Sequence, residues 1–163
     1  MKKDKYPPPA VQKPSPTFLQ IISTDYLGQN FFIMTFAGWA IYFVDGLFEG
    51  KTTFLLLVAA AILTPVGLLT FYWRYRTIVS TFANGIEIEG EVVDVETIST
   101  GRRREDRILH YEYNVNGRTY QYQNRVKKNS FARKVRAGQQ VTLLAHEKTP
   151  HIAFIKDIYL EPL

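Results

Sequence analysis

The chain has 163 residues, a formal net charge of +5 and 46% hydrophobic residues, which fits one folded domain with a membrane anchor. It contains no cysteine, and this excludes disulfides, thiol nucleophiles and cysteine-based metal sites. Most of the positive excess follows Trp73, where 15 Lys and Arg stand against 11 Asp and Glu. A basic excess beside a membrane is typical of a cytoplasmic face.

Residues 1–29 are predicted to form a proline-rich tail and a short interfacial segment. Proline fixes its own backbone dihedral and lacks an amide donor, so the tail is expected to be extended and solvated. Such a tail is either a plain solvated end or a docking ligand for a partner groove. From Thr17 to Tyr26 the apolar residues follow a short amphipathic pattern, which predicts a segment at the membrane interface.

Residues 30–84 are predicted to form a transmembrane helical hairpin. The stretch 52–73 has no charged residue and, as a helix, spans about 33 Å, enough to cross a bilayer core of about 30 Å. Residues 30–48 form a shorter and more aromatic first span. Only residues 49–51 join the two spans, so the helices are expected to be antiparallel neighbours.

Asp45 lies near the end of the first span and has two interpretations. It is either a helix-terminal carboxylate that reaches the membrane interface or a buried functional group. Lys and Arg flank the outer ends of the two spans, and the loop between them offers only Lys51. The positive-inside rule therefore predicts an integral membrane protein with both termini in the cytoplasm.

Residues 85–163 are predicted to form a cytoplasmic β-barrel domain. We expect the second helix to continue to Ala83 and to end at Asn84-Gly85. From Ile86 apolar and polar residues alternate, and the phase slips at Val92-Val93, which indicates a β-bulge. The predicted later strands are 107–115, 118–126, 141–145 and 152–160. Five short antiparallel strands suggest a small closed or partly open barrel, so the predicted fold class is an α+β membrane protein: a two-helix transmembrane hairpin followed by this barrel.

Asn116-Gly117 is a strong hairpin signal, because a type I′ turn needs positive φ at both central residues. A two-residue turn fixes the register and sets Tyr113 opposite Tyr120 and Tyr111 opposite Tyr122 on one face. The alternative to a core-facing ladder is a platform for stacking bases. The polar side chains of the other face favour the ladder.

The β region resembles the bacterial domain-of-unknown-function family DUF3592. The matching motifs are G-E-V-V-D-V at 90–95, Y-E-Y-N-V-N-G-R-T-Y at 111–120, A-G-Q-Q-V-T-L-L at 137–144 and I-A-F at 152–154. The resemblance implies a small β domain beside membrane helices in a bacterial inner membrane, or an equivalent bacterial membrane, and says little about chemistry. The sequence departs from the pattern at 146–151, where related domains usually have Tyr-Asp-Pro before a second proline. A weaker likeness is to the barrels of NfeD-like proteins.

We expect no enzyme activity, no cofactor and no metal. His146 and His151 flank one turn near Glu147, but no fixed ligand spacing supports a metal site, and surface histidines are the favoured interpretation. The serines lie in no nucleophile-elbow pattern and the glycines form no phosphate loop.

Two basic segments, the cluster 102–104 and the predicted loop 127–139, are the candidate site for contacts with lipid or a partner, with solvated loop charge as the alternative. Phe131 within the second segment is either an apolar anchor or a residue folded back over the barrel end. The candidate contact residues are Arg102, Arg103, Arg104, Lys127, Lys128, Phe131, Arg133, Lys134 and Arg136.

The sequence thus favours a non-enzymatic, membrane-anchored interaction or scaffold protein, an accessory subunit of a larger membrane complex. Its expected partners are membrane lipids and other membrane protein subunits, and no small-molecule substrate is indicated. The alternative from another class is a membrane-tethered nucleic-acid binder that uses the barrel, its tyrosines and its arginines.

Overall fold

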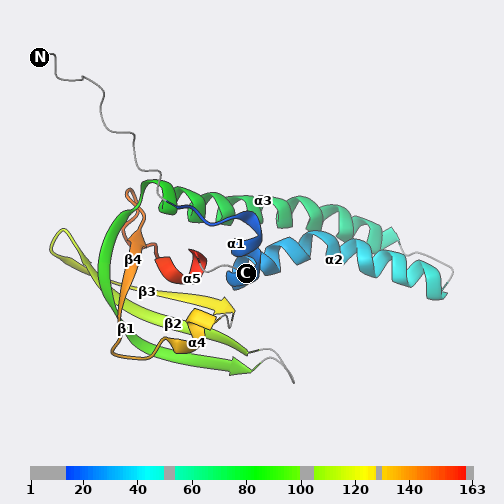
Figure 1. Ribbon diagram of the computed structural model, residues 1–163. Coiled ribbons are helices and arrows are strands. Elements are labelled where there is room, and N and C mark those ends of the chain that lie inside the picture. The colour runs from blue at the N-terminus through cyan, green and yellow to red at the C-terminus, as the bar shows by residue number, and fades with distance from the viewer. Residues whose placement is uncertain (1–13, 50–53, 100–104, 128–129, 161–163) are drawn as a thin grey trace, which may run out of the picture.

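A computed structural model describes residues 14–49, 54–99, 105–127 and 130–160. The proline-rich tail before Pro14, the hairpin turn around Lys51, and the candidate residues Arg102, Arg103, Arg104 and Lys128 lie outside these ranges. The described part begins with a short helix and an antiparallel helical pair, which are followed by the β region (Figure 1). The helices of this first part are α1 (Phe18–Thr24), α2 (Tyr26–Glu49) and α3 (Phe54–Asn84).

The helical pair packs closely because small residues stand at the contacts. A Cβ atom added to Gly38 would lie 2.8 Å from the Cα of Ala60, so only glycine allows this approach. Trp39 donates from its indole nitrogen to the Thr64 hydroxyl over 2.8 Å. The first helix starts at Tyr26 rather than Asn30, and the second runs unbroken to Asn84, as the Asn84-Gly85 signal predicted.

Both long helices leave most of their apolar surface uncovered. Only 11% of the most apolar stretch of each helix is buried, whereas a core helix of a soluble domain is covered on most sides. Leu55, Leu69 and Phe48 are among the exposed side chains. The hairpin is therefore long and apolar enough to cross a bilayer.

The β region is a five-stranded antiparallel sheet that curves into a nearly closed barrel (Figure 1), and the predicted fold class is confirmed. The strand order is β3-β2-β1-β4-β5. The register of the first pair shifts between Val92 and Asp94, which confirms the predicted bulge. The strands are β1 (Ile86–Ser99), β2 (Glu105–Val115), β3 (Arg118–Lys127), β4 (Gln140–Ala145) and β5 (Ala153–Ile155).

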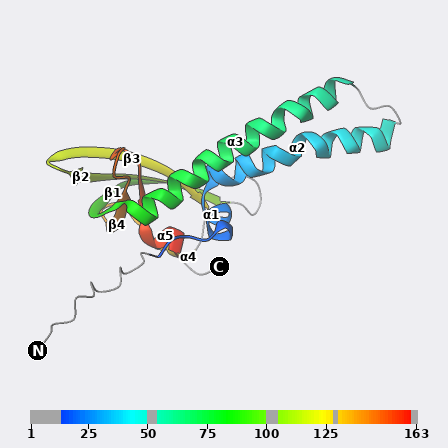
Figure 2. The ribbon, with the colours of Figure 1, turned by 90° about the horizontal axis from the view of Figure 1, so that it is seen from above.

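The helices lie against the open side of the barrel, where the sheet is not closed between β3 and β5 (Figures 1 and 2). They are α1, the second half of α3, and a short last helix, α5 (Lys156–Leu160). Ile21, Phe82 and Ile158 are at most 1% exposed and join the core of the sheet. The interfacial segment predicted around 17–26 thus places Ile21 inside the β domain.

Two local predictions were wrong. The predicted strand 152–160 is a strand only at Ala153–Ile155 and then turns into α5. A helical turn keeps Ile158 and Tyr159 both buried, whereas in a strand successive side chains point to opposite faces. The predicted loop 127–139 contains a short helix, α4 (Ser130–Lys134), with Ala132 buried beneath it.

The tyrosine hairpin is confirmed. Asn116 and Gly117 have φ values of 53° and 77°, and Tyr111 pairs with Tyr122 and Tyr113 with Tyr120. Tyr111 and Tyr113 are buried, and their hydroxyls donate to the carbonyls of Ala153 and Pro150 over 2.5 and 2.6 Å. The ladder is therefore a core element that ties β2 to the last part of the chain.

Candidate functional site

A buried ion pair lies where the helical hairpin meets the β domain. Asp25, between α1 and α2, is 0% exposed, and Arg74, in the middle of α3, is 6% exposed. The Arg74 guanidinium donates from Nε to Oδ2 of Asp25 over 3.1 Å and from Nη2 to Oδ1 over 2.7 Å. This two-pronged geometry is the strongest form of an arginine–carboxylate contact.

Two side chains of the β domain complete the network. Asn124 of β3 accepts from Arg74 Nη2 over 3.3 Å and donates to the Tyr159 hydroxyl over 2.8 Å. Tyr159 of α5 donates in turn to Oδ1 of Asp25 over 2.8 Å. The backbone amide of Gly28 donates to the other oxygen of Asp25 over 2.7 Å. Every oxygen of the buried carboxylate is thus satisfied, which a buried charge requires.

The electrostatics of the network keep Tyr159 protonated. Burial raises the pKa of the Tyr159 hydroxyl well above its usual value, and the negative charge of Asp25 raises it further. The proton of this hydroxyl is the one that it donates to Asp25, so the hydrogen bond persists at any ordinary pH. The Arg74 guanidinium also lies over the Phe154 ring, 5.0 Å from its centroid, and this cation–π contact further stabilises the buried charge.

The network joins four parts of the fold that lie far apart in the sequence. They are the α1–α2 junction, α3, β3 and α5, which bring Asp25, Arg74, Asn124 and Tyr159 together. The hydrogen bonds of these side chains go to one another, so together they fasten the four parts. The arrangement fixes the orientation of the β domain relative to the hairpin.

A second contact lies beside the network, at the end of β3. The Arg125 guanidinium stacks over the Tyr26 ring at 3.5 Å and donates to Asp106 over 2.7 Å. Asp25 also forms an isolated antiparallel bridge with Val126. The end of β3 therefore reaches the first turn of α2, and the ends of the neighbouring strands lie on the same side of the domain (Figure 1).

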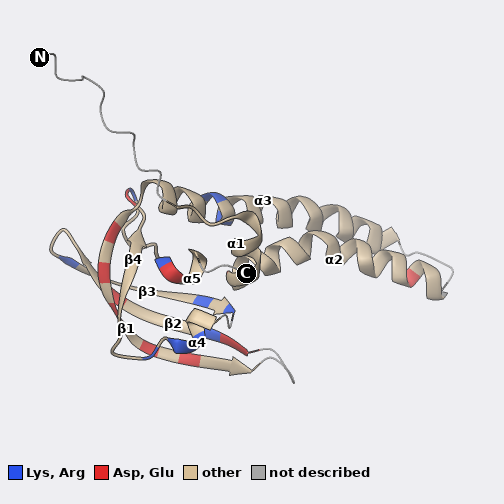
Figure 3. Cartoon of the chain, in the orientation of Figure 1, with Lys and Arg blue, Asp and Glu red and all other residues tan. Residues whose placement is uncertain are grey.

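The described candidate contact residues lie at this end of the domain. Lys127 ends β3, Arg133 and Lys134 are exposed on α4, and Arg136 is exposed just after it; Figure 3 shows basic residues on β3 and next to α4. Phe131 is half-buried and packs against the core, so of its two predicted placements the structure has the one folded back over the barrel end.

Arg107, which sequence reasoning missed, fixes the position of α4. Its guanidinium donates to the backbone carbonyls of Ala132 and Val135, the latter over 3.0 Å. Cationic side chains at a helix C-terminus satisfy carbonyls that have no partner within the helix. The basic residues of α4 are therefore presented from a fixed turn and not from a loose loop.

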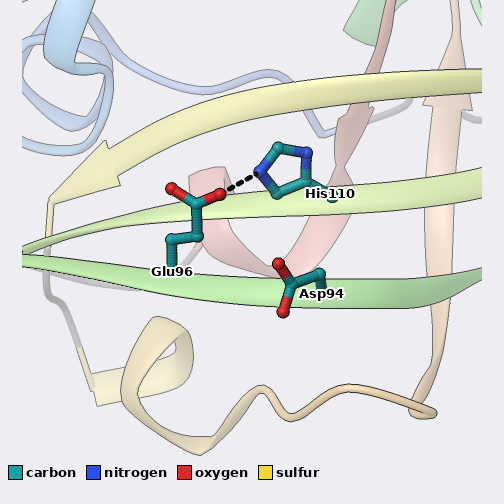
Figure 4. Close-up of side chains that lie close together, drawn as sticks. All are labelled: Asp94, Glu96 and His110. Carbon is teal, nitrogen blue, oxygen red and sulfur yellow. Dashed lines mark ion pairs between the residues drawn. The ribbon is translucent and has the colours of Figure 1, made fainter.

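The β-bulge sets up a group of titratable side chains on the outer face of the sheet (Figure 4). Possible ligand atoms of Asp94, Glu96 and His110 lie within 4.8 Å of one another. Asp94 and Glu96 are exposed, and His110 Nε2 lies 3.4 Å from Glu96. An exposed ion pair of this kind explains the grouping without a bound ion.

The histidine pair considered from the sequence has another role. His146 Nδ1 accepts from the backbone amide of Thr149 over 3.2 Å and contacts its hydroxyl at 2.8 Å. His146 thus stabilises the turn that leads into β5. The tyrosines of β2 are not available for stacking bases. A base-stacking platform needs exposed ring faces, and Tyr111 and Tyr113 are only 1% and 3% exposed.

A protein-family model described as a domain of unknown function, DUF3592, matches residues 88–157. The β region is a DUF3592 domain. The resemblance predicted from its turn glycines and core positions is thereby confirmed. Neither a curated protein nor a solved structure matches the chain significantly.

The DUF3592 domain contributes only part of the buried network. Asn124 lies within the matched residues, whereas Asp25, Arg74 and Tyr159 lie outside them. One signal in the sequence pointed to the pair: Asp25 and Arg74 lie at nearly equal distances along the chain from the turn between the two spans. In an antiparallel hairpin such residues come to the same level.

Proposed function

We propose that this protein is a non-enzymatic, membrane-anchored interaction module and an accessory subunit of a larger membrane complex. Its hairpin spans the bacterial inner membrane, and its DUF3592 domain lies on the cytoplasmic side with both termini. The observation that carries the proposal is the buried contact between Asp25 and Arg74. A tethered enzyme tolerates a loose anchor, whereas a scaffold gains from a domain held at a fixed orientation to its membrane helices.

The exposed surface of the hairpin supports the membrane part of the proposal. Side chains such as Leu69 and Phe43 are 68% and 61% exposed, and an uncovered apolar surface of this kind marks a contact with lipid or protein. Aromatic rings at Tyr72 and Trp73 precede Arg74, as at the end of a membrane span. Arg74 and Asp25 then lie at the cytoplasmic boundary.

The basic end of the domain supports a contact with anionic lipid headgroups. Arg133, Lys134 and Arg136 are exposed on α4 and just after it (Figure 3), at the end of the domain where β3 reaches the first turn of α2. Each Lys or Arg close to an anionic leaflet is worth about 1 kcal/mol. These residues therefore add a peripheral contact to the two spans.

Topology tests the membrane proposal. Reporter fusions at Pro14 and after Leu163 are expected to report the cytoplasm, and alkaline carbonate is expected to leave the chain in the membrane fraction. A periplasmic signal from either fusion, or release by carbonate, would contradict the hairpin.

Hydrogen exchange of the full chain in nanodiscs tests the lipid contact. Residues 130–136 are expected to exchange more slowly over anionic than over zwitterionic lipid, with a difference that shrinks as salt rises. Changing Arg133, Lys134 and Arg136 to Gln should abolish the difference. Equal exchange in the two kinds of disc would mean that this charge is only solvated.

Purification in gentle detergent tests the accessory role against the alternative. We expect stoichiometric membrane proteins to remain with the chain at raised salt and after nuclease treatment. Retention of single-stranded nucleic acid, lost steeply as salt rises, would instead support the nucleic-acid binder.

A further inference from the structure

One acidic side chain in the apolar part of the hairpin lacks a counterpart among the described residues. Asp45 is on α2, and its Oδ2 atom is shielded from solvent and accepts no hydrogen bond from any described group. By contrast, the carboxylate of Asp25 accepts from four donor atoms. An ionisable group that is left without a partner in a membrane span is expensive.

Helix geometry places Asp45 at the border of two faces of α2. It comes two turns after Gly38, whose side of the helix packs against α3, and one turn after Ile41, which is 57% exposed. Side chains four or seven residues apart lie on the same face of a helix. The carboxylate therefore lies beside the α2–α3 contact, at the edge of the outer surface of α2.

That outer surface is hollowed around the carboxylate. A groove is lined by Ala40, Ile41, Val44, Asp45 and Phe48. Val44 and Phe48 are 52% and 84% exposed, and Ala40 is small enough to let a second backbone approach closely. The groove thus has the apolar walls and the small residue typical of a helix–helix contact in a membrane.

We propose that this groove is the docking site of a transmembrane helix from another protein, and that this helix carries a Lys or Arg side chain opposite Asp45. The inference rests on the membrane-anchored function proposed above. A nearby opposite charge lowers the free-energy cost of a carboxylate in an apolar medium. Lipid tails alone provide no such charge and leave that cost unchanged. A second copy of this chain would bring another Asp45 to the groove, so a foreign basic helix is the better fit.

Site-specific photo-crosslinking of the full chain in its native membranes tests the proposal. A photo-reactive amino acid is placed at Ile41, in the groove, or at the matched control Phe43, which is 61% exposed on another side of α2. We expect one discrete protein adduct from position 41 and a much weaker one from position 43. The captured protein should have a Lys or Arg within a membrane span.

Charge variants then decide whether Asp45 carries the contact. Asp45→Asn, which keeps the shape, should lower the adduct from position 41 about tenfold or more, whereas Asp45→Glu should retain most of it. Exchanging Asp45→Lys together with the partner's basic residue to Asp should restore the adduct. Adducts with lipid only, with a second copy of this chain, or of equal yield in Asp45→Asn would overturn the proposal.

The two proposals fail in different ways. Asp45→Asn is expected to remain carbonate-resistant in the membrane with the thermal midpoint of the unchanged chain, because the two spans and the buried network are untouched. Membrane retention without an Asp45-dependent adduct overturns the docking site alone. Loss of the unchanged chain itself from the membrane overturns the membrane-anchored function and, with it, the docking site.

Discussion

The two halves of α3 meet different surroundings although they form one unbroken helix. Up to Trp73 most large side chains point outward, with Leu55, Leu69 and Trp73 72%, 68% and 65% exposed. From Arg74 onward one stripe is buried, at Arg74, Ile78, Thr81 and Phe82. The spacing of three and four residues in that stripe is the signature of a helix packed on one side.

In the topology proposed above, this difference reflects one helix that meets two solvents. The only buried polar groups that the first half offers are small hydroxyls. Because most of its apolar surface is exposed, this half is stable only in a surrounding apolar phase. The second half buries a charge, and it does so only because Asp25, Asn124 and Tyr159 satisfy it. The change of surroundings falls between Trp73 and Arg74.

The largest effect is expected from breaking the buried ion pair. Asp25→Ala leaves the Arg74 guanidinium buried without a countercharge, which costs about 3–5 kcal/mol. Thermal unfolding in detergent should show this loss, together with faster proteolysis between α3 and β1. Glu87→Ala is the matched control, because it removes an exposed pair with Lys156 that is worth at most about 1 kcal/mol. Equal losses of stability in Asp25→Ala and Glu87→Ala would contradict a stabilising role of the network.

The first half of α3 is best tested through a close contact with α2. Gly38→Leu forces side-chain atoms into the backbone of Ala60 and should destabilise the hairpin by about 1–3 kcal/mol. Ala61→Leu, at an exposed neighbouring position, should change stability by less than about 0.5 kcal/mol. Reversible denaturation in mixed micelles measures both. A tolerated Gly38→Leu would mean that the helices do not pack through Gly38.

The dependence of stability on alkaline pH tests the buried half of the comparison, where α3 meets the β domain. The pKa of Tyr159 is raised in the folded state by burial and by Asp25, so the unfolded chain loses this proton first as the pH rises. The stability that Tyr159 contributes is fully present below pH about 10 and falls by about 1.4 kcal/mol per pH unit as the pH climbs toward the folded value. Tyr159→Phe should therefore give a shallower decline of stability with pH. An unchanged slope would mean that the hydroxyl is not buried against Asp25.

The smallest effect concerns the tip of the β2–β3 hairpin, far from the network. Gly117→Val should destabilise the protein by somewhat more than about 1 kcal/mol, because a β-branched residue resists the φ of 77°. Thr119→Val, exposed on the adjoining strand, is the control and should be nearly neutral. An unchanged melting midpoint in Gly117→Val would contradict a turn that needs positive φ at this residue.

Features set by neighbouring residues were predictable from the sequence. Asn116-Gly117 alone determined the tyrosine register, and the phase slip at Val92-Val93 placed the bulge, because turn type and strand period act over a few residues. The uncharged run 52–73 identified the second apolar helix in the same way.

Features set by contacts between distant residues were not predictable. Arg74 had the pattern of an ordinary positive charge after a span, and only its distance from the interhelical turn, nearly equal to that of Asp25, linked the two residues. Their partners Asn124 and Tyr159 come from β3 and α5, so the network exists only once the barrel is closed over α3. The same packing turned 156–160 into a helix, since Ile158 and Tyr159 must both face the core.

The central claim is that the Asp25–Arg74 network fixes the β domain on the hairpin. The sequence has no cysteine, so spin labels can be attached at Leu69→Cys on α3 and Thr119→Cys on β3 without background. Pulsed electron-spin distance measurement in nanodiscs should give one narrow distance distribution for this pair, and a broad one when Asp25→Ala is added. A distribution that is broad in both proteins, or narrow in both, would contradict the account.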